Sequence, residues 1–316
     1  LSIPFSAFWR GGLVVGPTGG GKTRWLELVN LQVAEKFPEA CDIVISPKGD
    51  FAPNFRRECY RRGWKRRVTY IDFSERRRLP GLNVIRAWGS DHLQAKIQRE
   101  VLARSMGIYD LSETPRLARY SFTGLYAAIA SRLTMREAAL VLDHADGGVR
   151  QAVIERLPEC SARRDLVWLE AMGERMGQAG AARFFEEQVG STLNRLRLLT
   201  ENPVLRLMLG SQRSLEWETL LAPGRIVVVN ADQGTSLDRE DQRYLVMSMV
   251  ADIARTCFSR PPEQRVRVLL TLDEAGWFAS GVLQDILDRG REFQLSLLGA
   301  VQYPSQLINP RTCDRQ

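Results

Sequence analysis

Gly11-Gly-Leu-Val-Val-Gly-Pro-Thr-Gly-Gly-Gly-Lys-Thr23 sets the architecture of this chain. Within it, Gly16, Gly21, Lys22 and Thr23 match the pattern G-x-x-x-x-G-K-[ST], which is typical of a phosphate-binding loop. The context agrees, because a short apolar run precedes the loop and a helical pattern follows it over residues 24–36. The predicted binding site is the whole loop: Gly16, Pro17, Thr18, Gly19, Gly20, Gly21, Lys22 and Thr23.

A phosphate-binding loop needs glycine for a physical reason. A loop that wraps a phosphate closely leaves no room for a Cβ atom, and its backbone must reach positive φ to aim successive N–H groups inward. We expect Lys22 to reach the β- and γ-phosphates and the Thr23 hydroxyl to hold Mg²⁺, with the positive end of the helix dipole adding to the field.

The bulk composition sets limits on the class of protein. A chain of 316 residues suggests two domains, and no apolar run is long enough to span a membrane. Because the chain starts at Leu1 without Met, an anchor removed upstream is admissible. Five cysteines without metal or disulfide spacing suit buried thiols in a reducing cytoplasm.

The charge is positive and dominated by arginine. The net charge is +7, and only five of the 44 basic residues are lysines. Arginine forms bidentate contacts with phosphate, so an anionic polymer is an admissible partner, but a codon bias explains the same composition.

The order of the expected elements predicts an α/β fold with a mostly parallel sheet, interrupted by an all-helical insert. Apolar β-branched runs resemble buried strands, whereas the middle of the chain has helical spacing, as at Leu93, Ile97, Val101 and Leu102. We expect the apolar positions of the insert to be core. The expected strands cover residues 42–46, 68–72, 225–230, 266–272 and 295–301, the nucleotide-binding domain covers 1–85 and 222–316, and the insert covers 86–221.

A basic segment from Arg56 to Arg78 has two interpretations. It holds ten basic residues against three acidic ones, with Tyr60 and Trp64 among them. A solvated helix face and a nucleic-acid track both explain this pattern.

Two carboxylates follow the strand Val268–Leu272. Neighbouring side chains in a strand point to opposite faces, so we expect Asp273 to serve the metal and Glu274 to act as the general base or to orient water. Arg291 is our candidate for an arginine that a neighbouring subunit supplies to the γ-phosphate, and Arg289 is the second choice. Capping of a helix C-terminus by cations is the alternative for either arginine.

Seven ordered motifs make the chain resemble a known family, the type IV secretion coupling proteins of bacterial conjugation. These are the TraG/TraD-like branch of the FtsK/HerA motor superfamily. The motifs are Pro17–Thr23, Ser46–Asp50, Pro80–Val84, Ser191–Arg195, Leu272–Ala275, Asp288–Glu292 and Val301–Leu307. The resemblance implies a RecA-like P-loop NTPase domain, a homo-hexameric ring, and ATP hydrolysis that moves single- or double-stranded DNA.

The resemblance also assigns residues. It gives Lys22 and Thr23 the phosphate and metal roles, Asp273 and Glu274 the second motif, Arg291 the trans-acting finger, and Gln302 the γ-phosphate sensor. The family usually has an acid where this chain has Ser46, which leaves the role of that position open.

The resemblance further implies a place in the cell. A relaxase or secretion-channel proteins would be partners, and the protein would lie on the cytoplasmic face of a bacterial inner membrane, held by segments outside this sequence. One alternative is a ring ATPase of the same superfamily that moves protein, or that acts in DNA end processing or phage defence with a nuclease partner. Another is a nucleotide-gated scaffold without sustained turnover.

Overall fold

The computed structural model describes residues 5–75, 79–86, 89–232, 234, 237–279 and 281–307. The chain divides into two compact units, an α/β unit of Leu1–Arg78 with Glu216–Gln316 and a helical unit of Leu79–Leu215. The sequence predicts the helical insert at residues 86–221, and in the structure both of its boundaries lie earlier, at 79 and 215. Within the described residues, no helix is at once long and apolar enough to cross a membrane.

The α/β unit is built on one six-stranded sheet in the order β1-β6-β5-β2-β4-β3. Every pair of neighbouring strands is parallel, which confirms the predicted α/β class. Five of the strands match the expected runs, and the other precedes the phosphate loop. The strands are β1 (Gly12–Val15), β2 (Cys41–Ser46), β3 (Val68–Asp72), β4 (Ile226–Asn230), β5 (Val268–Leu272) and β6 (Leu295–Val301).

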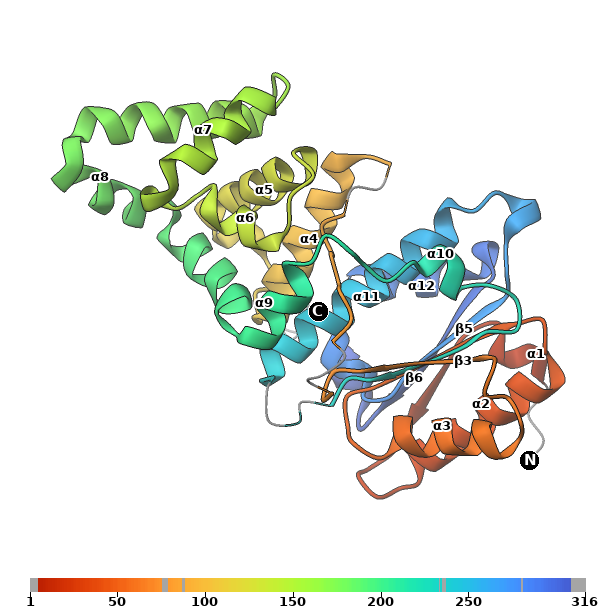
Figure 1. Cartoon of the computed structure of the whole chain (residues 1–316). Helices are drawn as coiled ribbons and strands as arrows, with labels where there is room; N and C mark the ends of the chain where they lie inside the picture. The colour runs from red at the N-terminus through yellow and green to blue at the C-terminus, as the bar shows by residue number, and fades with distance from the viewer. Residues whose placement is uncertain are drawn as a thin grey trace. The chain divides into compact units, whose positions relative to one another are not determined.

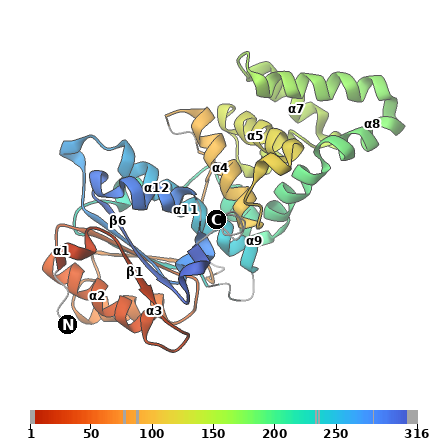
Figure 2. The same ribbon diagram turned by 180° about the vertical axis from the view of Figure 1, so that it is seen from behind.

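Helices cover both faces of this sheet. In both ribbon views, α2 and α3 lie on one face and α11 and α12 on the other (Figures 1 and 2). The helices of the unit are α1 (Phe5–Phe8), α2 (Lys22–Lys36), α3 (Phe51–Arg61), α10 (Trp217–Leu220), α11 (Arg239–Ser259) and α12 (Gly281–Arg289). Its 3-10 helices are η3 (Pro262–Gln264), η4 (Ala275–Phe278), η5 (Gly290–Phe293) and η6 (Pro304–Leu307).

The core on the α2 and α3 side shows why the strands are continuous apolar runs. Leu26 of α2 and Phe55 of α3 pack with Val44, Val228 and Leu269 of the central strands, all fully buried. Because side chains alternate along a strand, the residues between these point to the opposite face, which α11 and α12 cover. A sheet covered on both faces needs apolar residues at every position, and β2, β4, β5 and β6 are buried throughout.

Two features of the strand order position the site. All strands run the same way, so their carboxyl ends meet at one edge, which we call the catalytic edge. β6 lies between β1, which leads into the phosphate loop, and β5, which ends in the acidic pair. β1 itself is an edge strand among the described residues, and its side chains Leu13 and Val15 are 45% and 47% exposed.

The helical unit contains helices and no strand within its described residues. These are α4 (Asp91–Ser105), α5 (Pro115–Ala130), α6 (Met135–Leu140), α7 (Gly147–Arg156), α8 (Ser161–Glu201) and α9 (Pro203–Leu209), with η1 (Leu111–Glu113) and η2 (His144–Asp146). The helical course of α8 is interrupted at Gly177, whose φ of 64° and ψ of 172° lie outside the helical region.

The expectation that the apolar positions of the helical unit are core is wrong at several positions, since Trp168, Met176, Leu198 and Leu207 are exposed, and α4 gives a further case. Leu93, expected in the buried stripe of α4, is 55% exposed, whereas Gln94 and Gln98 are buried. Val101 and Leu102 are buried as predicted, so the departure from the predicted stripe is confined to the first half of α4. Gln94 is accommodated because its amide donates a hydrogen bond to the carbonyl of Val84 at 2.7 Å, and a satisfied amide is not penalised by burial.

Candidate functional site: a phosphate loop beside an acidic strand end

The phosphate loop has the backbone that the sequence predicts. Gly19 and Gly21 both have φ of 79°, in the left-handed region that favours glycine. Gly20 donates its N–H to the carbonyl of Pro17 at 3.1 Å, and a Cβ at Gly20 would lie 3.0 Å from that same oxygen. The tight turn therefore requires glycine for both conformation and space.

Lys22 and Thr23 follow the loop as the first residues of α2. The Lys22 side chain is buried within the loop, and its ammonium donates to the carbonyl oxygens of Gly16 at 2.7 Å and Pro17 at 2.9 Å. Thr23 lies on the exposed side of the helix start. The positive charge and the helix N-terminus thus meet at the same point, as anion binding requires.

Asp273 faces the phosphate loop from the end of β5. Its Oδ2 atom lies 3.5 Å from the hydroxyl of Thr23 and 3.4 Å from that of Ser46. Burial, followed by the charge of Glu274, raises the pKa of Asp273, while Lys48 and the hydrogen bond from Ser46 oppose the shift. A carboxylate and a hydroxyl oxygen this close are hard ligands of the kind Mg²⁺ prefers, so the two residues fit a magnesium site.

Glu274 follows Asp273 directly, and its carboxylate has a different neighbour, Lys48 in place of Thr23 and Ser46. Its φ of 54° is in the left-handed region, which is uncommon for a residue with a side chain. One carboxylate oxygen, Oε1, lies 2.6 Å from the ammonium of Lys48. The other oxygen, Oε2, is buried and has no hydrogen-bond partner among the described residues.

Lys48, within the motif Ser46–Asp50, is the residue of the site to which the sequence assigns no role. It follows β2, which pairs with β5 so that Ile45 stands opposite Leu272. The turn after β2 therefore lies beside the acidic pair. Knowledge of the strand order is needed to see this, because 226 positions separate Lys48 from Glu274 along the chain.

Gln302 lies at the catalytic edge, directly after β6. The carbonyl of Val301, the preceding residue, accepts the N–H of Gly16 at 3.2 Å, so Gln302 is adjacent to the phosphate loop. The backbone N–H of Gln302 is bonded to the side chain of Gln306 at 2.7 Å, and the Tyr303 hydroxyl donates to the Gln302 amide oxygen at 3.2 Å. These contacts hold the glutamine at the start of η6.

Arg291 lies at the opposite edge of the sheet. It belongs to η5, just before β6 begins at Leu295, and the carbonyl of its neighbour Glu292 accepts a hydrogen bond from Arg265, which precedes β5. At about 3.3 Å per residue, the length of β6 puts roughly 20 Å between this position and the phosphate loop. Arg291 is exposed, whereas Arg289 stacks 5.2 Å from the ring of Phe258.

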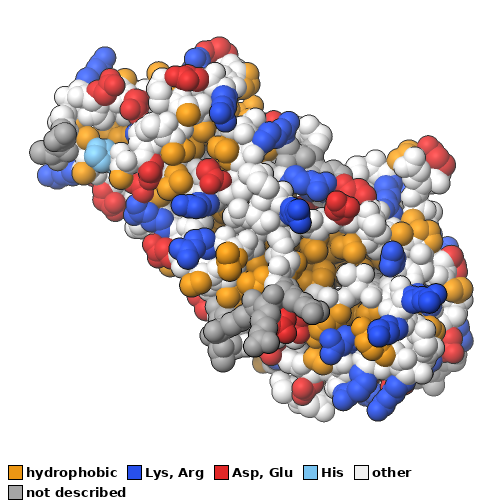
Figure 3. All heavy atoms as spheres, in the orientation of Figure 1, with side chains coloured by type: hydrophobic (Ala, Val, Ile, Leu, Met, Phe, Trp, Pro, Cys, Tyr) orange, Lys and Arg blue, Asp and Glu red, His pale blue; other side chains and the backbone are white. Residues whose placement is uncertain are grey.

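The basic segment is largely engaged in contacts within the α/β unit. Arg62 pairs with Glu35 at 3.1 Å, Arg67 donates to the carbonyls of Gly224 and Ala34, and Trp64 packs against the core rather than facing outward. Arg56 stacks 3.9 Å above the ring of Tyr70. Lys and Arg side chains are interspersed with acidic and hydrophobic ones on the face shown in Figure 3. Arg76, Arg77 and Arg78 lie outside the described residues.

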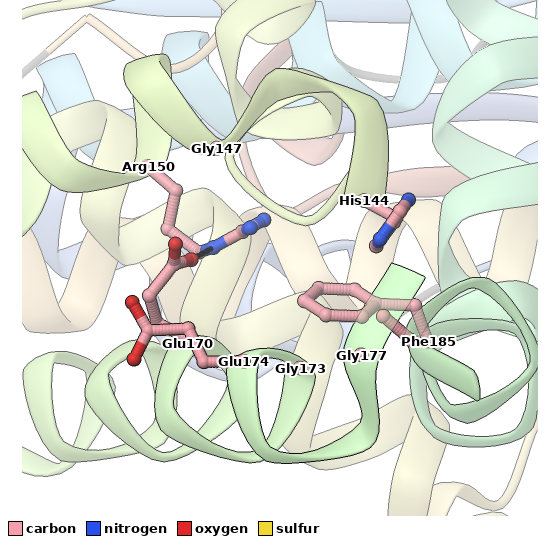
Figure 4. Close-up of a pocket in the computed structure, with 9 residues that line it drawn as sticks. His144, Gly147, Arg150, Glu170, Gly173, Glu174, Gly177 and Phe185 are labelled. Atoms are coloured by element: carbon pink, nitrogen blue, oxygen red, sulfur yellow. Dashed lines mark hydrogen bonds and ion pairs between the residues drawn. The ribbon is translucent and has the colours of Figure 1, made fainter. Parts of the chain in front are cut away.

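The helical unit has a hollow of its own, of about 370 Å³, between α7 and α8 (Figure 4). Arg150 points across it to Glu170 and also donates to the carbonyl of Asp143 at 2.9 Å, while its guanidinium lies 4.7 Å from the ring of Phe185. These contacts commit the charge of Arg150 to holding the two helices together. None of the site residues predicted from the sequence lines this hollow.

Comparisons with known proteins show similarity in fold and none in sequence families. No protein-family model and no curated protein matches the sequence. Among solved structures, the chain is similar to the bacterial conjugative coupling protein TrwBdeltaN70 in its unbound form, with 19% identity and a TM-score of 0.61. The match covers 97% of this chain and 66% of that one. The chain thus spans slightly less than two thirds of that relative's length.

Two further structures are similar over nearly the whole chain. The plasmid coupling protein TrwB in complex with ADP and Mg²⁺ gives 18% identity and a TM-score of 0.63, covering 99% of this chain and 68% of that one. VirB4 of Thermoanaerobacter pseudethanolicus gives 16% identity and a TM-score of 0.57, covering 96% and 72%. These similarities confirm the P-loop NTPase fold and agree, at the level of fold, with the family that the sequence resembles.

Proposed function

We propose that the α/β unit binds ATP with Mg²⁺ at the phosphate loop and hydrolyses it. The observation that carries this proposal is the meeting of the phosphate loop with Asp273 at 3.5 Å from Thr23, beside a second buried carboxylate. The similar TrwB structures were obtained with ADP and Mg²⁺, with the ATP analogue ADPNP and with the GTP analogue GDPNP, which supports a nucleotide site with Mg²⁺. The choice of ATP follows the family that the sequence resembles.

Each residue of the catalytic edge has a proposed role. Lys22 and the loop N–H groups bind the β- and γ-phosphates, and Thr23 with Asp273 holds Mg²⁺, which supplies charge neutralisation when bound. Glu274 accepts the proton of the attacking water. Gln302, adjacent to the loop, senses the γ-phosphate.

Arg291 acts on a neighbouring subunit in this proposal. A residue at the amino edge of the sheet, roughly 20 Å from its own phosphate loop, is too far away to stabilise charge there. An arginine supplied by another subunit is worth a factor of about 10³ to 10⁵ in rate. The proposal therefore includes a ring of identical subunits, a homo-hexamer as the resemblance implies, in which each active site is shared.

The work done by hydrolysis is, we propose, the movement of DNA. The similar structures include conjugative coupling proteins, and the net charge of +7 suits an anionic polymer. Relaxase or secretion-channel proteins are the proposed partners, at the cytoplasmic face of a bacterial inner membrane. The chain spans 66% of the length of TrwBdeltaN70, so its partners and place in the cell are proposed and not carried over from that structure.

One experiment separates this function from its alternatives. The rate of ATP hydrolysis is measured with and without single- and double-stranded DNA, while light scattering gives the mass of the protein in solution. Hydrolysis that DNA stimulates in an oligomer supports the motor. Hydrolysis indifferent to DNA favours a ring ATPase that moves protein, and binding without turnover favours a nucleotide-gated scaffold.

A further inference from the structure

An ion pair joins the turn after β2 to the proposed general base. The ammonium of Lys48 lies 2.6 Å from Oε1 of Glu274. The two side chains differ in environment, since that of Lys48 is 47% exposed and that of Glu274 is 7% exposed. A lysine reaching in from solvent therefore supplies the counter-charge for a carboxylate that has almost no contact with water.

The turn that carries Lys48 is held from several sides. The carbonyl of Pro47, the residue before it, accepts a hydrogen bond from the fully buried amide of Gln242 at 2.8 Å. A Cβ at Gly49, the residue after it, would lie 3.0 Å from the carboxylate of Asp232. The backbone N–H of Lys48 itself donates to the Ser46 hydroxyl oxygen at 3.4 Å. These contacts fix the backbone of Lys48 and therefore the point from which its side chain extends toward Glu274.

An aromatic ring completes the surroundings of the ammonium. Lys48 lies 5.4 Å from the centre of the Trp277 ring, and the guanidinium of Arg239 lies 4.3 Å from the same ring. The backbone N–H of Trp277 in turn donates to the backbone carbonyl of Glu274 at 2.9 Å. Lysine, tryptophan and glutamate therefore form one connected group at the catalytic edge.

The two oxygens of Glu274 are left in different situations by this arrangement. Oε1 is bound to Lys48, while Oε2 is buried without a partner among the described residues. An acceptor of this kind binds a donor strongly, because nothing else satisfies it in a medium of low dielectric constant. A water molecule beside the γ-phosphate is the donor that the proposed reaction provides.

We propose that Lys48 is a positioning residue for hydrolysis, holding Oε1 of Glu274 so that Oε2 is the oxygen that accepts the proton of the attacking water. The inference rests on the proposed ATPase function. A general base must be held within hydrogen-bond reach of the water, and a displacement of about 1 Å costs up to roughly 100-fold in rate. Lys48 touches neither nucleotide nor water in this proposal and acts through Glu274.

Three variants test the role through the kinetics of ATP hydrolysis. Lys48→Ala should lower kcat by roughly 10- to 100-fold and leave KM for ATP unchanged, because the phosphate loop is intact. Lys48→Arg should recover part of the loss, since it restores a cation on that turn. Lys96→Ala, at an exposed lysine of the helical unit, is the matched control and should match the wild type.

A double variant distinguishes positioning from a general structural effect. In a Glu274→Gln background, Lys48→Ala should cause no further loss of kcat, because a residue that acts through Glu274 has nothing left to position. An additive loss in the double variant would overturn the inference. So would an unchanged or a raised kcat in the single variant Lys48→Ala, and a raised kcat would mean that the ion pair restrains the base.

A binding measurement separates this inference from the function on which it rests. Wild type should bind MgADP with aluminium fluoride, a mimic of the transition state, more tightly than MgADP alone. Lys48→Ala should lose most of that preference and keep its affinity for MgADP. If wild type shows neither turnover nor the preference, the proposed function is wrong and the inference falls with it. If wild type shows both and Lys48→Ala keeps both, only the inference is wrong.

Discussion

The hydroxyl of Ser46 lies 3.4 Å from Oδ2 of Asp273, at the centre of the catalytic edge. The family that this chain resembles usually has an acid at the position of Ser46. In this structure a second carboxylate would face Asp273 directly, in a place where burial already raises the pKa of that group. The serine instead donates a hydrogen bond that favours the charged form of Asp273.

Replacing Ser46 with an acid should therefore destabilise the protein in a pH-dependent way. Two adjacent carboxylates raise the folded-state pKa of the pair above its unfolded value, so stability is lost as pH rises through that raised pKa and regained as pH falls. We expect Ser46→Asp to melt below Ser46→Asn at pH 8, by an amount that shrinks toward pH 4 and on addition of Mg²⁺. Thermal melts of both variants check this, and equal melting at every pH would contradict it.

Removing Lys22 and neutralising Glu274 should have different effects on the nucleotide. Lys22→Ala removes the charge that bridges the phosphates, so both nucleotide binding and turnover should be lost. Glu274→Gln should keep binding and lose turnover by roughly 10² to 10⁴, the usual contribution of a general base. Titration with a fluorescent ATP analogue and steady-state hydrolysis give the two quantities. An equal loss of binding in both variants would exclude Glu274 as the base.

Mixing two inactive variants should restore hydrolysis if Arg291 acts between subunits. A Lys22→Ala subunit binds no nucleotide but still presents Arg291, while an Arg291→Ala subunit binds nucleotide but lacks the arginine. We expect partial recovery at interfaces where each subunit supplies what the other lacks. Light scattering must first confirm mixed oligomers. Absence of recovery in such oligomers would mean that Arg291 does not complete a neighbour's site.

The exposed arginines at the end of α3 and in the turn after it should make DNA affinity depend on salt concentration. If this surface contacts a DNA backbone, the logarithm of affinity falls linearly with the logarithm of salt concentration, with a slope of about −0.7 to −0.9 for each phosphate contacted. Neutralising Arg61, Arg62 and Arg66 together should flatten the slope. Fluorescence anisotropy between 50 and 300 mM salt measures it, with Arg67 left intact because it donates to Gly224 and Ala34. An unchanged slope would assign the segment to a solvated face.

The protein should be more stable when Asp42 is replaced by asparagine. It is fully buried at the start of β2, neither carboxylate oxygen has a partner among the described residues, and burial raises its pKa well above the ordinary value, with Arg67 opposing. A raised folded pKa means that stability falls as pH rises through it. Asp42→Asn should therefore raise Tm at pH 8, by about 2 to 4 °C for each kcal/mol gained, and by less at pH 5. A lowered Tm would show that Asp42 is ionised and supported by Arg67.

Four strands, β2, β4, β5 and β6, were predictable because each is a buried and largely apolar run whose neighbours are turns. β2 and β3 lie within one residue of their expected limits. The phosphate loop and the pair Asp273 and Glu274 were predictable because each is a motif of residues that are consecutive in the sequence.

Other features depend on spatial neighbours. Lys48 could not be assigned, because nothing in the sequence says that β2 lies against β5. Leu93 was wrongly predicted to be buried, because the prediction followed the spacing of leucine and isoleucine and did not consider that glutamines can face the core. Gln94 does so because the carbonyl of Val84 satisfies its amide. Trp64 was taken as a candidate for base stacking, but its ring packs on the core.

The phosphate loop follows an edge strand of the sheet. Among the described residues β1 pairs with β6 alone, so its alternate N–H groups have no strand partner on the outer side. Deuterium uptake at residues 12–15 should therefore be rapid compared with β5 and β2, which are hydrogen-bonded on both sides. A bound phosphate that accepts hydrogen bonds from the loop N–H groups should slow the local opening of β1, which leads into the loop. Exchange at β1 thus becomes a direct gauge of nucleotide occupancy, while exchange in the middle of the sheet stays constant.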